Sequence, residues 1–191
     1  MHKIVVIAGS PTVLQKKRDL SEFDLVVKLN CIPDDEKYDA YISNRCDIWA
    51  FSSHIIEKKC IDKNLRNRRM FNENIIKLIY SKKQYMFRSL HKKLVNENIQ
   101  NYEFIPKKFI RNVENINKFN SPLVMSTGFI ILMFLMKKFK NSYIYLLGFT
   151  HQLNNDIHFY DNQEAFTIHD FEKEKIIIDN LVSNGKLFRI V

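Results

Sequence analysis

The fold is decided by residues 3–30, KIVVIAGSPTVLQKKRDLSEFDLVVKLN. Two short apolar runs in this stretch, Ile4–Ile7 and Leu25–Val27, are rich in β-branched residues and contain no polar residue. Such uninterrupted runs are typical of strands that helices cover on both faces, as in a parallel sheet. Gly9 follows the first run, where glycine permits unusual backbone angles and the close approach of a ligand. The stretch therefore predicts two parallel strands, with a turn after the first that a ligand can approach closely.

Further apolar runs of the same kind predict the remaining strands, and helical patterns lie between them. The strands are expected at residues 47–51, 75–80, 143–147 and 187–191. The helices are expected at residues 84–98, 107–119, 126–139 and 170–184. This alternation predicts an α/β fold: a single Rossmann-like, doubly wound, mostly parallel sheet with helices on both faces, in one domain over residues 1–191. The more polar residues 54–120 leave room for a small lid or an acceptor-binding insertion.

The composition is that of a globular protein with a basic surface. The chain has 191 residues, 46% of them hydrophobic, with 30 basic and 21 acidic residues and a net charge of +9. A basic surface attracts the phosphates of a nucleic acid, an anionic membrane or a phosphorylated small molecule. A nucleic-acid-binding module needs basic residues interleaved with exposed aromatic ones, whereas the aromatic residues here fall mostly within apolar runs. We therefore expect no nucleic-acid partner and keep such a module as an alternative.

Cysteine usage and hydropathy indicate the compartment. Cys31, Cys46 and Cys60 have no metal-ligand spacing and form no even-numbered disulfide framework, which favours a reducing cytoplasm. The longest apolar stretch, residues 129–136, is far shorter than the ~20 residues that span a bilayer. The first apolar run lacks a signal-peptide cleavage site. We expect a cytoplasmic protein, with peripheral association at the anionic inner membrane surface left open.

Three of the four glycines lie where an α/β enzyme holds its ligand. Gly9 and Gly148 follow predicted strands, and Gly128 lies at the start of a predicted helix. In open α/β sheets the ligand crevice lies outside the carboxyl ends of the strands. The first turn, AGSPTVL, lacks the second and third glycines of a dinucleotide-binding loop and the Gly-Lys-Ser/Thr ending of a P-loop. Asn30 ends the second strand with an amide that suits a ribose hydroxyl or a pyrimidine edge.

Two helix N-termini carry residues with the chemistry of a transferase. Ser126, Thr127 and Gly128 would supply hydroxyl and backbone N–H groups at the start of a helix, which suits an anion. His169 directly precedes the last predicted helix, whose positive end disfavours the imidazolium and keeps the ring neutral. A neutral imidazole is suited to act as a general base near pH 7. These positions predict an anion-binding turn and a base.

Five short motifs lie at predicted strand and helix ends, and the first of them has two parts. They are IAGSPTVL (7–14) with DLVVKLN (24–30), MSTG (125–128), YIYLLGF (143–149), HFYD (158–161) and HDFEKE (169–174). In this order they resemble motif L, motif S, the Tyr-Gly-Phe segment, motif III and the His-x4-Glu motif VS of the family-29 sialyltransferases. Residues 45–51, RCDIWAF, resemble the bacterial family-42 sialyltransferases. The resemblance covers residues 4–51 and 121–191, and the turn asparagine of the family is replaced by Ala8 or Gly9.

The resemblance implies a GT-A-like sialyltransferase variant, which transfers sialic acid with inversion from a CMP-sugar donor to a glycan or glycolipid acceptor. It implies that His169 is the base and that His158 and Tyr160 donate to the leaving phosphate. Lys28, which stands where the family has arginine, and Glu174, which we expect to orient a loop or the base, are predicted to have supporting roles. The donor-binding residues that it implies are Gly9, Ser10, Asn30, Ser126, Thr127, Gly128, Gly148 and Tyr160.

The sequence also predicts a transferase without a metal or cofactor. It contains no Asp-x-Asp clamp and no His/Cys/Asp/Glu cluster with ligand spacing. A monophosphate leaving group needs less charge neutralisation than a diphosphate, so side-chain donors are expected to suffice. Two further alternatives are a CMP-Kdo-dependent Kdo transferase, which uses the same type of 2-keto acid sugar, and a non-catalytic transferase-like domain. The expected setting is synthesis of a bacterial surface polysaccharide or lipooligosaccharide.

Overall fold

The structure, a computed structural model, describes residues 1–30, 36–53, 74–81, 87–96, 99–119, 125–150 and 169–190. These residues form a seven-stranded sheet in the order β5-β4-β3-β2-β1-β6-β7. Every neighbouring pair in the sheet is parallel. The strands are β1 Lys3–Ile7, β2 Leu25–Leu29, β3 Ile48–Ser52, β4 Ile76–Tyr80, β5 Tyr102–Phe104, β6 Tyr143–Leu147 and β7 Phe188–Arg189.

The strand order makes the sheet doubly wound around β1. The chain first adds β2 to β5 on one side of β1 and then adds β6 and β7 on the other. The direction of winding therefore reverses between β1 and β6, and connections diverge there to leave a crevice at the carboxyl ends of the two strands. The fold itself thus marks this point as the place where a ligand is expected to bind.

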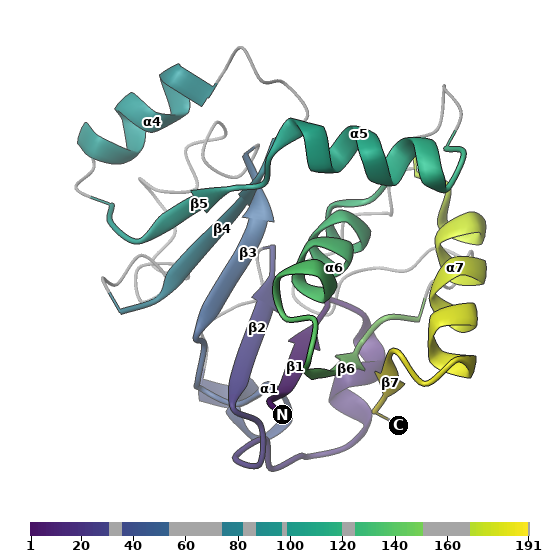
Figure 1. Cartoon of the computed structure of the whole chain (residues 1–191). Coiled ribbons are helices and arrows are strands. Elements are labelled where there is room, and N and C mark those ends of the chain that lie inside the picture. The colour runs from purple at the N-terminus through teal and green to yellow at the C-terminus, as the bar shows by residue number, and fades with distance from the viewer. Residues whose placement is uncertain are drawn as a thin grey trace.

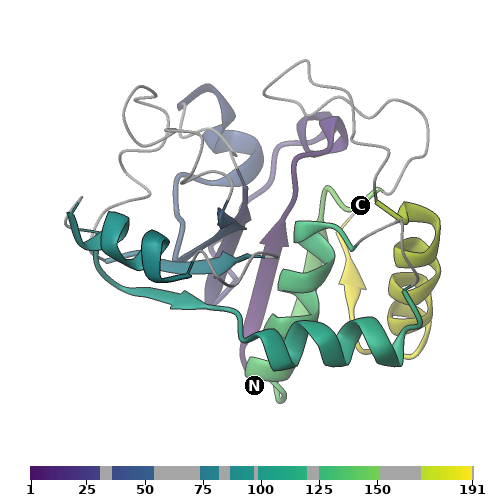
Figure 2. The ribbon, with the colours of Figure 1, turned by 90° about the horizontal axis from the view of Figure 1, so that it is seen from above.

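Helices cover both faces of the sheet. Three of them, α5 (Lys107–Ile116), α6 (Thr127–Lys138) and α7 (Phe171–Ser183), lie on the face to which Ile4 and Val6 point. Their arrangement is visible in Figure 1, and Figure 2 shows that α5 runs from the end of β5 to the side of α7. The other face carries the remaining elements: the 3-10 helices η1 (Pro11–Gln15) and η2 (Glu36–Tyr38), α1 (Asp39–Ile42) and α4 (Phe87–Asn96).

The sequence explains why α6 lies at the centre of this layer. It is apolar on every side, and six of its twelve residues are buried. A helix that is apolar all round belongs in a core. Its last turn ends with Lys137 and Lys138, which favour the negative end of the helix dipole. The prediction of a buried helix over residues 126–139 is confirmed.

The predicted α/β class, the parallel sheet and the helices on both faces are confirmed. The prediction missed β5, a three-residue strand at the edge of the sheet. Within residues 54–120 the described residues form β4, α4, β5 and α5. Residues 54–73 and 82–86 lie outside the described part of the chain, so a lid there stays a prediction.

Residues 45–47, in the segment that resembles family 42, fasten the amino ends of two strands. The guanidinium of Arg45 donates to the carbonyl of Phe23 at 2.9 Å and pairs with the Asp47 carboxylate at 2.9 Å. Asp47 in turn accepts the backbone N–H of Val26 at 2.7 Å. These bonds hold the start of β2 against the start of β3. The contacts of Arg45 and Asp47 are therefore structural, and they lie at the edge of the sheet opposite to the crevice.

Candidate functional site

Small polar residues follow five of the strands. They are Ser10 after β1, Asn30 after β2, Ser53 after β3, Ser81 after β4 and Thr150 after β6. Because the carboxyl ends of parallel strands meet at one edge of the sheet, these side chains line a common polar rim. Two of them are buried and bonded to each other, since Ser53 Oγ donates to Ser81 Oγ at 3.0 Å.

Three hydroxyl groups gather at the point where the winding reverses. Thr150 Oγ1 donates to Ser10 Oγ at 3.1 Å, and Ser10 Oγ lies 3.2 Å from Thr12 Oγ1. The Ser10 side chain also caps η1 by accepting the N–H of Thr12. The predicted site included Ser10 but missed Thr12 and Thr150. The signal for Thr150 was its place two residues after Gly148, just beyond a predicted strand.

A pocket of about 320 Å³ opens beside these hydroxyls. Its lining includes Thr12, Gly148 and Thr150, together with Arg18 and Arg189. The Arg189 guanidinium is fixed by bonds to the Phe149 carbonyl and the Asp179 carboxylate, both at 2.6 Å. Guanidinium groups and hydroxyls around one cavity suit a phosphate or a carboxylate. Of the predicted donor-binding residues, Gly148 lines this pocket.

Gly148 occupies a conformation that only glycine adopts at ease. Its φ is +75°, and a Cβ placed on it would lie 2.6 Å from Val13 Cγ1 and 2.7 Å from the carbonyl oxygen of Ala8. The second contact is with backbone of the first turn, which cannot move aside without opening the crevice. Gly148 therefore keeps the turns after β1 and β6 in contact.

We expect Gly148→Ala to lower the free energy of unfolding by about 2–5 kcal/mol, because a left-handed backbone and a steric clash each add a cost. Urea denaturation measures the loss. Gly128→Ala is the matched control, since its Cβ would meet Leu29 Cδ1 at 3.4 Å and Phe149 Cε1 at 3.7 Å, which are ordinary contacts. We expect that control to change stability by less than about 1 kcal/mol. Equal stabilities of the two variants would contradict the close approach at Gly148.

Asn30 also has a left-handed backbone, with a φ of 52°. Asparagine tolerates this region better than most residues do. Its N–H donates to the Ala50 carbonyl at 2.9 Å, and its carbonyl accepts the indole N–H of Trp49 at 2.6 Å. The backbone of Asn30 is thereby committed to the sheet. The side-chain amide is the group that Asn30 offers to a ligand.

The start of α6 lies against the carboxyl ends of β2 and β6. Gly128 in its first turn faces Leu29, the last residue of β2, and Phe149, which follows β6. Ser126 caps the helix, because its Oγ accepts the N–H of Phe129 at 3.1 Å. The structure thus brings the predicted turn of Ser126, Thr127 and Gly128 to the same rim as Asn30.

Glu174, in the first turn of α7, binds the residue that caps α6. Its Oε1 accepts the backbone N–H of Ser126, and its Oε2 accepts the Ser126 hydroxyl at 2.7 Å. The side chain is fully buried. Burial raises the pKa of the Glu174 carboxyl to about 7, although the two bonds from Ser126 lower it. Glu174 joins the first turns of α6 and α7.

The pKa of Tyr80, at the end of β4, is raised to about 12, mainly by burial and then by the charges of Glu114 and Glu174.

His169 lies at this same junction. It is half-buried and directly precedes Asp170, whose carboxylate caps α7 by accepting the N–H of Lys173 at 3.1 Å. Its ring is 5.4 Å from the ring of Phe171. Because Glu174 ties the first turn of α7 to Ser126, the residue that precedes this turn, His169, lies on the α6 side of the fold, and its role as the base stays a prediction. His158 and Tyr160 lie outside the described residues, and their roles stay predictions.

Lys28, in β2, directs its side chain to the face of the sheet that carries α1 and not to the polar rim. It is 1% exposed, and its ammonium donates to the carbonyl of Ser43 at 2.6 Å. This bond holds the connection between α1 and β3. Its predicted supporting role toward the donor stays a prediction. Among the residues that the structure describes, no group of three or more His, Cys, Asp or Glu side chains is placed to hold a metal ion.

No family model matches the sequence, and no curated protein matches it significantly. Solved structures match its fold over nearly the whole chain. A mammalian sialyltransferase has a TM-score of 0.72 at 13% identity, over 99% of this chain and 68% of that one. The sialyltransferase CstII from Campylobacter jejuni, solved with cytidine-5'-monophosphate, has a TM-score of 0.63 at 12% identity, over 99% of this chain and 79% of that one. The chain has a sialyltransferase fold.

A third neighbour agrees with these two. The monofunctional alpha-2,3-sialyltransferase Cst-I from Campylobacter jejuni has a TM-score of 0.62 at 16% identity, over 99% of this chain and 75% of that one. The sialyltransferase fold confirms the predicted resemblance and the predicted GT-A-like variant of the doubly wound sheet. No described helix is long and apolar enough to cross a membrane.

Proposed function

We propose that this protein is an inverting glycosyltransferase that uses a CMP-activated 2-keto acid sugar, sialic acid, and a glycan acceptor. The observation that supports this most directly is the polar rim at the reversal of winding, where Ser10, Thr150 and the start of α6 converge. Neighbours with this fold were solved with CMP and with CMP and a trisaccharide acceptor. A rim of amide, hydroxyl and helix N–H groups offers the donors and acceptors that a nucleotide needs.

In the proposed reaction His169 takes the proton of the acceptor hydroxyl. The acceptor oxygen then forms a bond to the anomeric carbon as the bond from that carbon to the CMP phosphate oxygen breaks. The electron pair of the broken bond leaves with CMP, whose developing charge His158 and Tyr160 stabilise. A base at the acceptor hydroxyl and hydrogen-bond donors at the leaving phosphate lower the barrier without a covalent intermediate.

The proposed donor site divides into two parts. Asn30 and the turn at Ser126 and Gly128 hold the nucleoside and the carboxylate of the donor, because an amide and a helix N-terminus suit those groups. Gly9, Ser10 and Gly148 let the backbone of both turns approach the phosphate. We place Glu174 behind this surface, where its bonds to Ser126 fix the direction of the α6 N-terminus.

The proposal extends to the setting. A CMP leaving group with side-chain donors is expected to need no metal and no cofactor. A cytoplasmic protein at the inner membrane would suit the synthesis of a bacterial surface polysaccharide or lipooligosaccharide, whose acceptors are built there. The net charge of +9 supports attraction to anionic partners of this kind.

A donor screen tests the proposed function. The purified protein is incubated in EDTA with a galactoside acceptor and either CMP-sialic acid or CMP-Kdo, and the release of CMP is measured. We expect acceptor-dependent release from CMP-sialic acid, because in the proposed reaction side-chain donors stabilise the leaving phosphate without a metal. Release from CMP-Kdo alone would assign the chain to Kdo transfer. Activity that EDTA abolishes and magnesium restores would contradict metal independence. Failure to bind CMP at all would contradict the transferase and leave a non-catalytic domain or a nucleic-acid module.

A further inference from the structure

The excess of positive charge is concentrated in the segment that contains α5 and α6. Residues 105–140, which contain α5 and α6, carry seven basic residues and one acidic residue, a net charge of +6. The whole chain has a net charge of +9, so this fifth of the sequence holds two thirds of the excess. The basic residues are Lys107, Lys108, Arg111, Lys118, Lys137, Lys138 and Lys140. We name this set the basic face.

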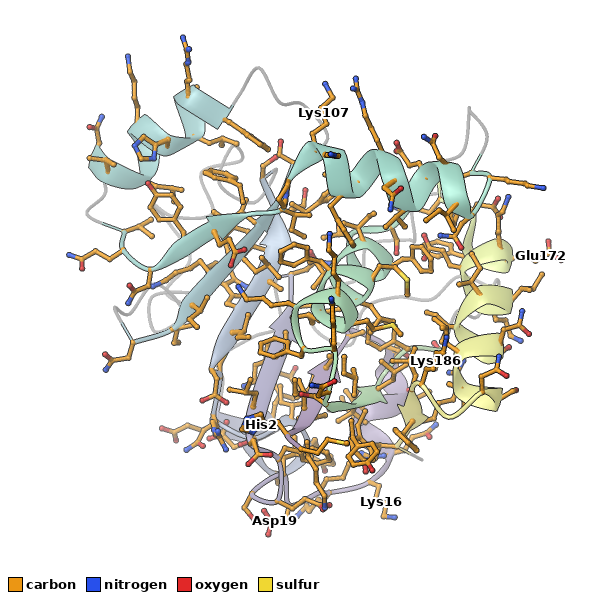
Figure 3. The ribbon with its side chains drawn as sticks, in the orientation of Figure 1. His2, Lys16, Asp19, Lys107, Glu172 and Lys186 are labelled. Atoms are coloured by element: carbon orange, nitrogen blue, oxygen red, sulfur yellow. The ribbon has the colours of Figure 1, made fainter. Side chains whose placement is uncertain are left out.

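The helices present the basic face to solvent. On α5 the apolar residues Phe109, Ile110 and Val113 are buried, so the opposite side of the helix, with Lys108 and Arg111, is exposed. Figure 3 shows Lys107 directed away from the body of the molecule at the start of α5. Amphipathic helices place their charged side outward in this way.

The end of α6 adds its lysines to the start of α5. The ammonium of Lys137 lies 5.4 Å from the centre of the Phe109 ring, which places the last turn of α6 beside the first turn of α5. Of the basic face, Lys138 alone forms an ion pair with a carboxylate in the described part of the chain, that of Glu103. No carboxylate of the described residues pairs with the other six cations, so an external anion can reach them from that side.

The basic face extends to the edge of the proposed site. Ile116, in the last turn of α5, is 69% exposed and follows the exposed Lys108 and Arg111 along the helix. Two residues later, the carbonyl of Lys118 accepts the ammonium of Lys173 in the first turn of α7 at 2.5 Å. That turn also holds Glu174, and His169 precedes it. A surface that binds α5 would therefore lie next to the mouth of the site.

We propose that the basic face docks on an anionic lipid surface. Exposed clusters of Lys and Arg are attracted to the negative surface of an anionic membrane, and α5 can present its cations in this way while its apolar side stays packed in the core. A single-stranded nucleic acid would need exposed aromatic rings for base stacking. The aromatic residues of α5 and α6 instead point inward, since Phe109, Phe129 and Phe134 are all buried. This inference gives a surface to the proposed membrane association, and it does not depend on catalysis.

Vesicle sedimentation tests the inference without any turnover. Binding is measured to phosphatidylcholine vesicles with and without about 30% phosphatidylglycerol, at about 0.15 M salt. The test variant carries Lys108→Gln, Arg111→Gln and Lys137→Gln, three exposed positions of the basic face. We expect the wild type to bind the anionic vesicles only. We expect the variant to bind them about 100-fold more weakly, because each Lys or Arg near such a surface raises the affinity about fivefold.

The control variant removes the same charge elsewhere. It carries Lys16→Gln, Lys17→Gln and Lys186→Gln, which are also exposed. Lys16 and Lys107 lie at opposite ends of the molecule in Figure 3. We expect this control to bind vesicles within about threefold of the wild type. Equal losses in the two variants, or no loss in the test variant, would overturn the docking face. So would tighter binding of the wild type to single-stranded DNA than to vesicles, if the test variant lost it.

Discussion

Replacement of His169 by alanine is expected to lower kcat by about 100- to 10,000-fold while leaving the affinity for CMP nearly unchanged. In the proposed reaction the imidazole acts on the acceptor hydroxyl, so its loss slows proton transfer without removing a donor contact. His169 is half-buried and precedes the helix whose first turn Glu174 ties to Ser126, which is the position that the proposed base requires. Steady-state rates of CMP release and calorimetric titration with CMP measure the two quantities.

Two other histidines sharpen this result. His2→Ala is the control, because His2 lies at the amino end of β1 near Asp24, away from the rim, and its loss should leave kcat unchanged. His158→Ala should slow turnover and weaken CMP binding together, since its proposed partner is the phosphate. A folded His169→Ala protein that kept most of its activity would remove the base assignment. The proton would then have to be taken by another group, such as a carboxylate or His151, which lies outside the described residues.

The sheet was largely predictable from the sequence because its central strands are buried on both faces. Six of the seven strands coincide with apolar runs, as Ile4–Ile7 does within β1. The exception, β5, has the sequence Tyr102-Glu103-Phe104 and is half-buried at the sheet edge. With one neighbouring strand and three residues, it needs no apolar run, so periodicity could not reveal it.

The site was predictable only where local backbone chemistry leaves a mark. Gly148 and Asn30 are turn residues with positive φ, and Ser126 is a helix cap, so each has a signal in its own segment. The contacts that assemble the site have none. Thr150 bonds to Ser10 across 140 residues, and Glu174 bonds to Ser126 across 48. Such pairs follow from the strand order, which sequence patterns did not specify.

The bond between Glu174 and Ser126 leads to a second large effect, on stability. The carboxyl has a pKa of about 7 in the folded protein, raised from an ordinary value of 4.5 mainly by burial. Between these two values the folded state binds more protons than the unfolded state does. The contribution of the Glu174 carboxyl to the free energy of unfolding is therefore complete below about pH 4.5 and is lost as the pH rises to 7. The total change is about 3 kcal/mol.

Glu174→Gln and Glu174→Ala separate the charge from the contact. Glutamine keeps an oxygen to accept the N–H of Ser126 and has no charge to bury, so we expect the decline of stability between pH 5 and 8 to be smaller by about 3 kcal/mol than in the wild type. Alanine leaves both Ser126 donors without this carboxylate and opens a cavity, which is expected to cost about 2–4 kcal/mol at pH 5. Urea denaturation across this pH range measures both effects. Glu172→Gln, an exposed change in the same turn, controls for net charge and should follow the wild-type curve. Parallel curves for the wild type and Glu174→Gln would contradict the raised pKa of the Glu174 carboxyl and with it the cost of burying its charge.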